Sequence, residues 1–416
     1  MHVFHPFGQG LKQAAAALRV FAGQLLFGAE LELVTQGGRA CDVVALAICR
    51  KSGALLKQGE AVALGASTIG PSDGRQVGRQ TCVLSPSGLQ GAAARLVGQL
   101  LPQGRQRPRI LFPVKGEHYW YPYDYNFCWM YYRKDLYQQK GLKVPTTFEQ
   151  MAENCKALTE GGKFGVGHPL GANSATQWMS IGYLWADGLK MLDDNFKLLI
   201  DNADMKPRMI RYLDFMKKLQ PSMPPGMTQA LFGTVLGQYS GGQIAHAPYA
   251  GRLMEVLEDR APDLAGKTGF FMYPDSAGKA QAVNHASDGW VLLNTPMRDE
   301  AYKFMEWFTE RHYINFLHSA PLHFQPPRLD VYEDARWRAH PLIEKHAELV
   351  EFMRGILSNK DVIIRSIDTE GPRIDLRPGK MFETFAISEA IQNRLLKDMP
   401  AAEAVDIMAK KYRAVL

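Results

Sequence analysis

Three carboxylates, Asp124, Asp288 and Glu306, are the residues that could supply the acid and the base of glycoside hydrolysis. Such an enzyme holds two carboxyl groups across one bond, and no local spacing in the sequence brings two of these three together. The chain also has no G-x-S-x-G, P-loop, G-x-G-x-x-G or H-E-x-x-H pattern. We therefore expect no catalytic residue, and a glycoside-acting enzyme stays as an alternative.

Cysteine and histidine spacing gives no metal site. The five cysteines form no C-x-x-C pair, and they are Cys41, Cys49, Cys82, Cys128 and Cys155. His312, His318 and His323 are six and five residues apart, outside the i, i+4 spacing that aligns two ligands on a helix. We expect buried free thiols, no bound metal and no cofactor.

A dense aromatic run between Tyr119 and Tyr125 points to a different chemistry, the binding of a neutral sugar. Flat rings cover the C–H surface of a sugar, while polar side chains bind its hydroxyl groups. Strand alternation would put Tyr121, Tyr123 and Tyr125 on one face and Asp124 on the other. One face should be core and the other a binding surface, and we favour Tyr123 as a ligand contact.

The bulk composition excludes several classes of protein. At 416 residues the chain exceeds the usual size of one hydrophobic core, so two lobes are expected. No apolar, uncharged stretch is long enough to span a bilayer. Residues 1–109 hold 12 Lys and Arg against 5 Asp and Glu, and the rest of the chain is nearly balanced. Because these arginines are mostly dispersed, we expect no nucleic-acid partner.

Alternating strand and helix patterns from about residue 111 predict an α/β fold. Thr146 and Glu149 have the spacing of a capping box that opens a helix over about 147–159. A second helix is expected over 296–308, strands over 267–274 and 290–294, and two helices over 387–413, broken near Pro400. This alternation predicts a doubly wound, largely parallel sheet.

Six segments carry a family resemblance when they are taken in order. They are YWYPYDYNFCWMYYRKDLYQQKGLKVPTTFEQMAENCKALTEGGKFG at 119–165, GQIAHAPYAGRLMEVLE, APDLAGKTGFFMYPDSAG, VNHASDGWVLLNTPMRDEAYKFMEWF, HSAPLHFQPP and AAEAVDIMAKKYRAV. From about residue 115 to 416 the chain resembles the family 1 extracellular solute-binding proteins of ABC importers, the maltose-binding group. The resemblance implies a protein that binds and delivers and catalyses nothing.

The resemblance also implies an architecture, the two-lobed periplasmic binding protein type II fold, in which each lobe is a mostly parallel sheet flanked by helices. We expect crossings between lobes near residues 118, 245 and 320. Lobe 1 would then hold 1–118 and 246–320, and lobe 2 would hold 119–245 and 321–416. The partners it implies are a small carbohydrate or polyol ligand and the membrane permease subunits of an ABC importer.

Residues 1–110 fit no pattern of this family. They are either a divergent first lobe or a stretch whose reading frame or start differs from that of the true lobe. The family implies a periplasmic location, yet the N-terminus makes a poor signal peptide, because Arg19 interrupts its apolar stretch and no small-x-small cleavage site follows.

The resemblance implies ligand contacts in the segments between the lobes. Trp178 and Tyr249 fall where relatives place rings against sugar, and Asn126 falls at a polar position on a crossing strand. The alternatives are a helix face that buries Trp178 with Trp185, and an ordinary loop anchor at Tyr249.

The segment Asp288-Gly289-Trp290 lies where many members hold Gly-Gly-Trp or a similar turn next to ligand. Gly289 would admit the ligand, Trp290 would stack on it, and Asp288 or Asn284 would accept hydroxyl protons. The alternative is a turn with a buried Trp. Arg373 would close over the cleft, although an arginine there is more often part of a surface ion pair.

A ferric-ion-binding protein is the other alternative. Relatives that bind iron use adjacent tyrosines, and Tyr131 and Tyr132 are adjacent here. They lie in a turn where the whole family has an aromatic residue for structural reasons, so we expect no iron site.

Overall fold

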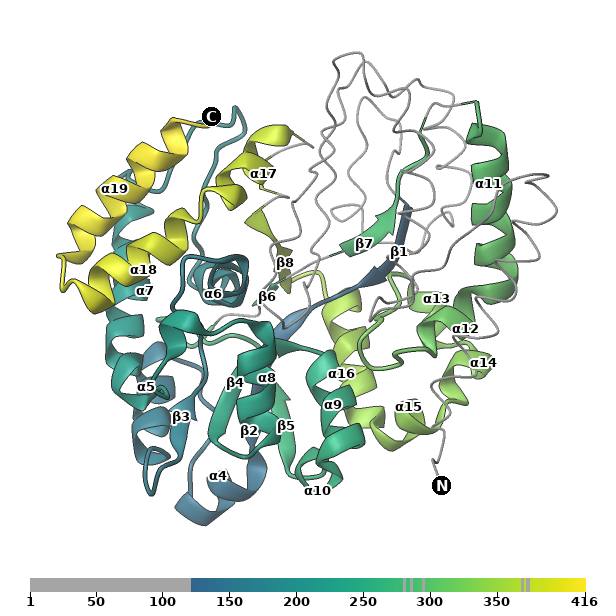
Figure 1. Ribbon diagram of the computed structural model, residues 1–416, viewed down its shortest axis with the longest axis horizontal. Helices are drawn as coiled ribbons and strands as arrows, with labels where there is room; N and C mark the ends of the chain where they lie inside the picture. The colour runs from purple at the N-terminus through teal and green to yellow at the C-terminus, as the bar shows by residue number, and fades with distance from the viewer. Residues whose placement is uncertain (1–120, 280–281, 285–286, 294–295, 368–369, 372–374) are drawn as a thin grey trace. The chain divides into compact units, whose positions relative to one another are not determined.

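The structure is a computed structural model that describes residues 121–416, except 280–281, 285–286, 294–295, 368–369 and 372–374 (Figure 1). The strands are β1 (Tyr121–Tyr125), β2 (Cys128–Arg133), β3 (Phe164–Val166), β4 (Ile244–Ala250), β5 (Thr268–Phe271), β6 (Ala282–Asn284), β7 (Ser287–Trp290) and β8 (Ile363–Arg365). Among these residues, no helix is both long and apolar enough to cross a membrane.

Helices make up most of the rest of the described chain. They are α4 (Lys134–Lys140), α5 (Phe148–Ala157), α6 (Ser174–Ala186), α7 (Lys206–Leu219), α8 (Phe232–Ser240), α9 (Arg252–Arg260), α10 (Pro262–Ala265), α11 (Arg298–Trp307), α12 (Tyr313–Leu317), α13 (Leu329–Tyr332), α14 (Ala335–Arg338), α15 (Pro341–Lys345), α16 (Ala347–Ser358), α17 (Leu376–Glu383), α18 (Ala386–Leu396) and α19 (Ala401–Arg413). Short 3-10 turns cover Gln220–Ser222 and Met227–Gln229, and a π-helix at Phe308–His312 joins α11 to α12.

The larger sheet is mixed, with parallel pairs as expected and one strand that runs against the others. Its order is β3-β4-β2-β6-β8, and β5 also pairs with β2. The pairs β3-β4 and β6-β8 are parallel, but β2 runs antiparallel to β4, β5 and β6. β3, β4, β5, β6 and β8 therefore share one direction, and β2, which enters from β1 of the smaller sheet after two residues, runs against them.

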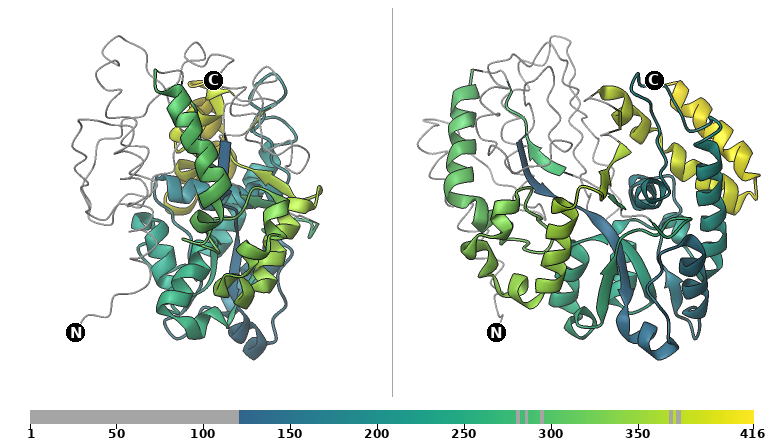
Figure 2. Two further views of the ribbon diagram at one scale, coloured as in Figure 1. Left: turned by 90° about the vertical axis from the view of Figure 1, so that its right-hand side faces the viewer. Right: turned by 180° about the vertical axis from the view of Figure 1, so that it is seen from behind.

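Helices cover this sheet and then pack on one another. α6 lies against β6, α8 against β4, and α5 against β3. The C-terminal helices α18 and α19 pack against each other and against α7, as Figures 1 and 2 show. The expected break in the C-terminal segment is confirmed, because α18 ends before Met399-Pro400 and α19 starts at Ala401.

The start of α5 lies one residue beyond its predicted position. The capping box uses Thr147, whose side chain accepts a hydrogen bond from the N–H of Gln150 at 3.1 Å. Gln150 returns a bond by accepting from the N–H of Thr147. The neighbouring pair Thr146 and Glu149 has the same spacing, so the sequence offered two registers.

The expected strand over 290–294 is displaced toward the N-terminus. β7 covers Ser287–Trp290 and pairs antiparallel with β1 in a separate two-stranded sheet. The apolar residues after Trp290 are not in a strand, and Leu292 instead packs with Tyr121 and Met305. The predicted strand over 267–274 contains β5 and is confirmed.

A buried polar network holds β4 to α4 and α5. His246 Nδ1 lies 2.6 Å from the carbonyl oxygen of Gly165, which can only accept, so Nδ1 carries the proton. Nε2 then accepts from the hydroxyl of Tyr137 at 2.6 Å, and that hydroxyl accepts from Asn154. Cys155 lies beside the same ring and, with Cys128, is a buried free thiol as expected. Cys41, Cys49 and Cys82 lie outside the described residues.

This network makes stability depend on pH. Burial lowers the pKa of His246 to about 4, while its bond to Gly165 opposes the shift. The unfolded imidazole has a pKa of about 6.5, so the unfolded state takes up protons first as the pH falls. His246 should therefore cost up to about 1.4 kcal/mol of unfolding free energy per pH unit between roughly 6.5 and 4.

Urea unfolding of the wild type and His246→Gln across pH 7.5 to 4.5 measures this effect. Subtracting the two curves cancels every other titrating group, including His168, whose pKa burial also lowers to about 4. The wild type should lose stability relative to the variant as the pH falls. A difference that does not change with pH would contradict the neutral tautomer assigned to His246.

Candidate functional site

The candidate site is built around the places where the chain passes from one sheet to the other. β1 of the smaller sheet leads into β2 of the larger one through Asn126 and Phe127, and β7 of the smaller sheet follows β6 of the larger one closely in the sequence. A third segment, which contains Gln325, pairs with the end of β1. Tyr125 and Gln325 exchange two backbone hydrogen bonds of 2.8 and 3.2 Å. We call Asn126, Phe127 and Gln325 the crossing.

The expected crossings between lobes near residues 118, 245 and 320 stay predictions, as does the assignment of chain segments to lobes. Residue 118 lies outside the described residues. Around residue 245, β4 continues unbroken from Ile244 to Ala250 and pairs with β2.

Tyr123 is at an irregularity in the pairing of β1 with β7. Pro122 faces Gly289 and Asp124 faces Asp288, so Tyr123 has no opposite residue. An extra residue of this kind is a β-bulge, which turns side chains away from strict alternation. The predicted face of Tyr121, Tyr123 and Tyr125 is therefore broken, with Tyr123 half-buried between two fully or nearly buried tyrosines.

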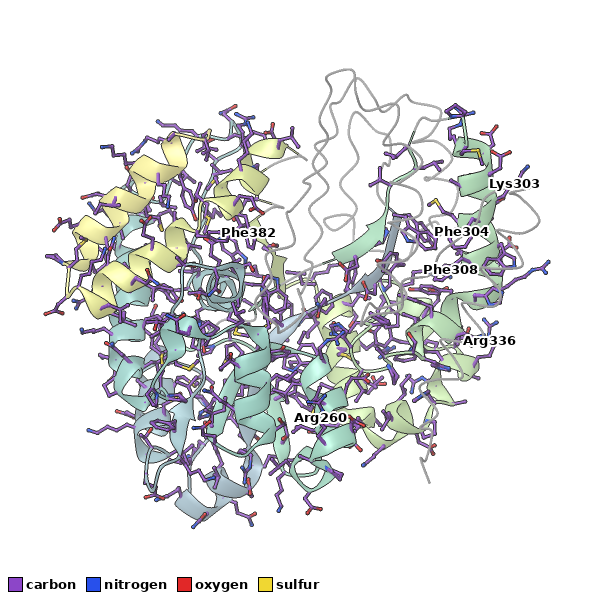
Figure 3. The ribbon with its side chains drawn as sticks, viewed as in Figure 1. Arg260, Lys303, Phe304, Phe308, Arg336 and Phe382 are labelled. Carbon is purple, nitrogen blue, oxygen red and sulfur yellow. The ribbon has the colours of Figure 1, made fainter. Side chains whose placement is uncertain are left out.

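Trp290 lies in an aromatic cluster rather than alone on a strand. Its ring centroid is 4.7 Å from that of Phe308, 5.4 Å from that of Phe304 and 5.5 Å from that of Tyr123. Figure 3 labels the two phenylalanines, which project from α11 and the π-helix toward β1 and β7. The predicted stacking face of Trp290 is partly covered by these rings.

Asp124 and Asp288 form a pair of facing carboxyl groups. Burial raises the pKa of Asp124 well above its usual value and Asp288 raises it further, while the Asp288 N–H and Arg252 oppose the rise. Burial also raises the pKa of Asp288, against the attraction of Arg252. The two strands thus hold a protonatable pair beside one guanidinium group from the start of α9.

A second group of predicted residues gathers around α6. The Trp178 ring meets Phe232 edge-on at 5.8 Å, and the Tyr249 hydroxyl donates to the Phe232 carbonyl oxygen at 3.3 Å. Asn284 is fully buried, and its Nδ2 donates to the Trp178 carbonyl oxygen at 2.7 Å. The structure thus joins Trp178 and Tyr249 through Phe232 at the start of α8, and Asn284 to the backbone of Trp178.

Gln177 extends this group toward α17. Its Nε2 donates to the carbonyl oxygen of Phe382, which Figure 3 labels, and its side chain is fully buried. Arg373, the predicted residue of the closing segment, lies outside the described residues. The predicted contacts that are described therefore form two groups, one on β1 and β7 and one around α6, with Asn126 at the crossing.

Sequence reasoning missed Gln325 and the pairing of Asp124 with Asp288. Gln325 is a single polar residue before two prolines, and no periodicity marks it. Asp124 was considered only as a catalytic carboxylate. The facing of the two aspartates depends on the register of two strands far apart in the chain, which local spacing does not give.

The geometry does not favour a shared metal. Successive residues of a strand point to opposite faces, so Tyr131 and Tyr132 cannot both bind one ion. Consistent with this, Tyr131 packs on Trp129 while Tyr132 packs on Tyr137 and Phe271. In the part of the chain that the structure describes, no group of three His, Cys, Asp or Glu residues could hold a metal ion.

Comparison with known families shows to which family the chain belongs. Residues 108–345, more than half of the chain, match the model of a family described as bacterial extracellular solute-binding protein. The chain belongs to this family. The resemblance inferred from the sequence motifs is confirmed, and the relatives of this solute-binding protein are proteins that bind substrates.

One curated relative is a mannitol-binding protein of Pseudomonas aeruginosa, 28% identical over 211 residues. That match covers 48% of this chain and 47% of the relative, so the solute-binding protein spans about half the length of the curated relative it matches.

Solved structures show the same fold. MalE3 of T. maritima, solved with maltose bound, has a TM-score of 0.62 at 18% identity, over 78% of this chain and 79% of its own. A solute-binding protein of Agrobacterium vitis with bound D-mannitol has a TM-score of 0.57 at 17% identity, over 76% and 79%. The expected class, the two-lobed α/β fold of periplasmic binding proteins, is confirmed.

The aspartate pair of this solute-binding protein generates a prediction about Asp124→Asn. The pKa of Asp124 is raised in the folded state, so the folded protein keeps this proton to a higher pH than the unfolded chain does. The free energy of unfolding therefore falls as the pH rises above the unfolded pKa of about 4. Asparagine does not titrate. The variant should therefore gain stability relative to the wild type at pH 8 and lose that gain near pH 4.

Thermal melts at both pH values measure the difference. Asp334→Asn is the matched control, because its hydrogen bond to Arg336 lowers the pKa of Asp334 and the expected change at pH 8 is a loss. If Asp124→Asn melts below the wild type at pH 8, then the ionised carboxylate contributes to stability and the assignment is wrong.

Proposed function

We propose that this protein is the substrate-binding component of an ABC importer that captures a sugar or polyol between two lobes and delivers it to a membrane permease. Family membership supports the binding of a solute. The class of solute is supported by a curated relative that binds mannitol and by similar proteins solved with D-mannitol, ribitol and maltose. The periplasm is the proposed location, as for its family.

The observation that carries the proposal is the placement of rings and amides on both sides of the crossing. Tyr123 and Trp290 lie on the β1 and β7 side, and Trp178 and Tyr249 on the α6 side. Rings cover the C–H surface of a polyol, and Asn126 and Asn284 are suited to its hydroxyl groups. A ligand that bridges both sides favours the closed arrangement of the lobes, which is the form that a permease would accept.

The proposed contacts differ in how far their side chains are buried. Asn126 and Tyr123 are half-buried and are proposed as direct contacts. Trp178, Tyr249 and Asn284 are buried and bonded to neighbours, so a ligand would meet their outer edges. Asp288, Gly289, Trp290 and Arg373 complete the proposed set. ATP would be hydrolysed by a partner subunit, since the chain carries no nucleotide-binding motif.

Thermal unfolding with added ligands tests the proposal. A ligand at a hundred times its dissociation constant adds about 2.7 kcal/mol to the free energy of unfolding, enough to raise the melting temperature by several degrees. Mannitol, ribitol and maltose are the first probes, and ferric iron and amino acids are the controls. A melt raised by iron or an amino acid and unmoved by every polyol and sugar would reject the proposal.

Tyr123 provides a sharper test of the binding surface. Tyr123→Ala removes the ring and should weaken polyol binding about tenfold or more, whereas Tyr123→Phe keeps the ring and should bind within about threefold of the wild type. Isothermal titration measures both affinities. Equal loss in the two variants would assign the role to the hydroxyl group, and no loss in either would remove Tyr123 from the site.

A further inference from the structure

The segment Leu322–Gln325 ties the start of α9 to the crossing. Glu255 Oε1 accepts a hydrogen bond from the N–H of Leu322 at 2.6 Å. Gly251 lies directly under the same segment, since a Cβ there would be 1.7 Å from the Leu322 carbonyl oxygen. At its other end, Gln325 bonds to the backbone of Tyr125. The segment is therefore held at both ends.

Gln325 is hydrogen-bonded to the residues on both sides of Asn126. Its backbone pairs with Tyr125 on one side, and its side-chain Oε1 accepts from the N–H of Phe127 at 3.1 Å on the other. Because a backbone N–H can only donate, this bond fixes which end of the carboxamide is oxygen. The amide nitrogen Nε2 must point away from Phe127.

Two polar atoms of the crossing have no hydrogen-bond partner among the residues that the structure describes. They are Nε2 of Gln325, a donor on a fully buried side chain, and Oδ1 of Asn126, an acceptor. A buried donor or acceptor without a partner is unfavourable, and native proteins rarely leave one. A group from outside the described residues would satisfy both.

Hydroxyl groups suit both atoms, because a hydroxyl can accept from Nε2 and can donate to Oδ1, whereas a carboxylate only accepts and an ammonium group only donates. We propose that Gln325 positions the crossing and that its Nε2, together with Asn126 Oδ1, binds hydroxyl groups of a neutral polyol or sugar. This rests on the proposed function and adds to it a contact residue, Gln325, and a preference for uncharged ligands.

Isothermal titration of the full chain with mannitol, ribitol and maltose tests the inference on Asn126→Ala and Gln325→Leu. Each variant should weaken binding of the probe that the wild type binds by about tenfold. The melting temperature without ligand should not fall in Asn126→Ala, because the lost acceptor has no partner in the described chain. It should fall in Gln325→Leu, which leaves the Phe127 N–H without its acceptor.

Gln139→Leu is the matched control, because Gln139 is exposed on α4 and its variant should bind as the wild type does. Wild-type affinity in both test variants would overturn the inference and leave the proposed function intact. If Gln325→Leu does not fold, Asn126→Ala decides alone, and an unchanged affinity there overturns the inference. If the wild type binds none of the three probes, the proposed function fails and the inference falls with it.

Discussion

The hydrogen bonding of β2 to three antiparallel partners is the constraint on which the rest of the described structure depends. β2 lies between β4 on one side and β5 and β6 on the other, and its first four residues are fully buried. It also continues from β1 with only two residues between them. The position of β2 therefore fixes where the crossing lies, and with it the distance between the two groups of proposed ligand contacts.

The sequence predicted the parts of the fold that depend on local chemistry. Pro400 cannot continue a helix, so the break between α18 and α19 was readable. The start of α5 was off by one residue because two adjacent pairs share the capping spacing. The β-bulge at Tyr123 was not readable, because it arises where Pro122 meets Gly289, a residue that local patterns do not connect to it.

The candidate site was predictable in its residue types and less so in its geometry. Rings and amides in the segments between the sheets were expected, and Trp178, Tyr249 and Asn284 do lie together. The rings over Trp290 correspond to the alternative of a buried Trp, and they come from α11 and the π-helix. Gln325 was missed because its role comes from bonds to residues distant in sequence. Pattern reasoning finds surfaces of the right chemistry and does not find the contacts that orient them.

The π-helix between α11 and α12 has an evolutionary consequence. A π-turn holds one more residue than an α-turn, so the helical segment from α11 to α12 is one residue longer than an unbroken α-helix with the same number of turns. At this turn the Thr309 hydroxyl donates to the Met305 carbonyl oxygen and accepts from the Tyr121 hydroxyl, while the Tyr313 hydroxyl donates to the Tyr123 carbonyl oxygen. Deleting one residue would rotate α12 relative to α11 and separate these bonds. Homologous chains without the extra residue should therefore show compensating changes on β1, and chains that keep it should conserve the length of this helix more strictly than its sequence.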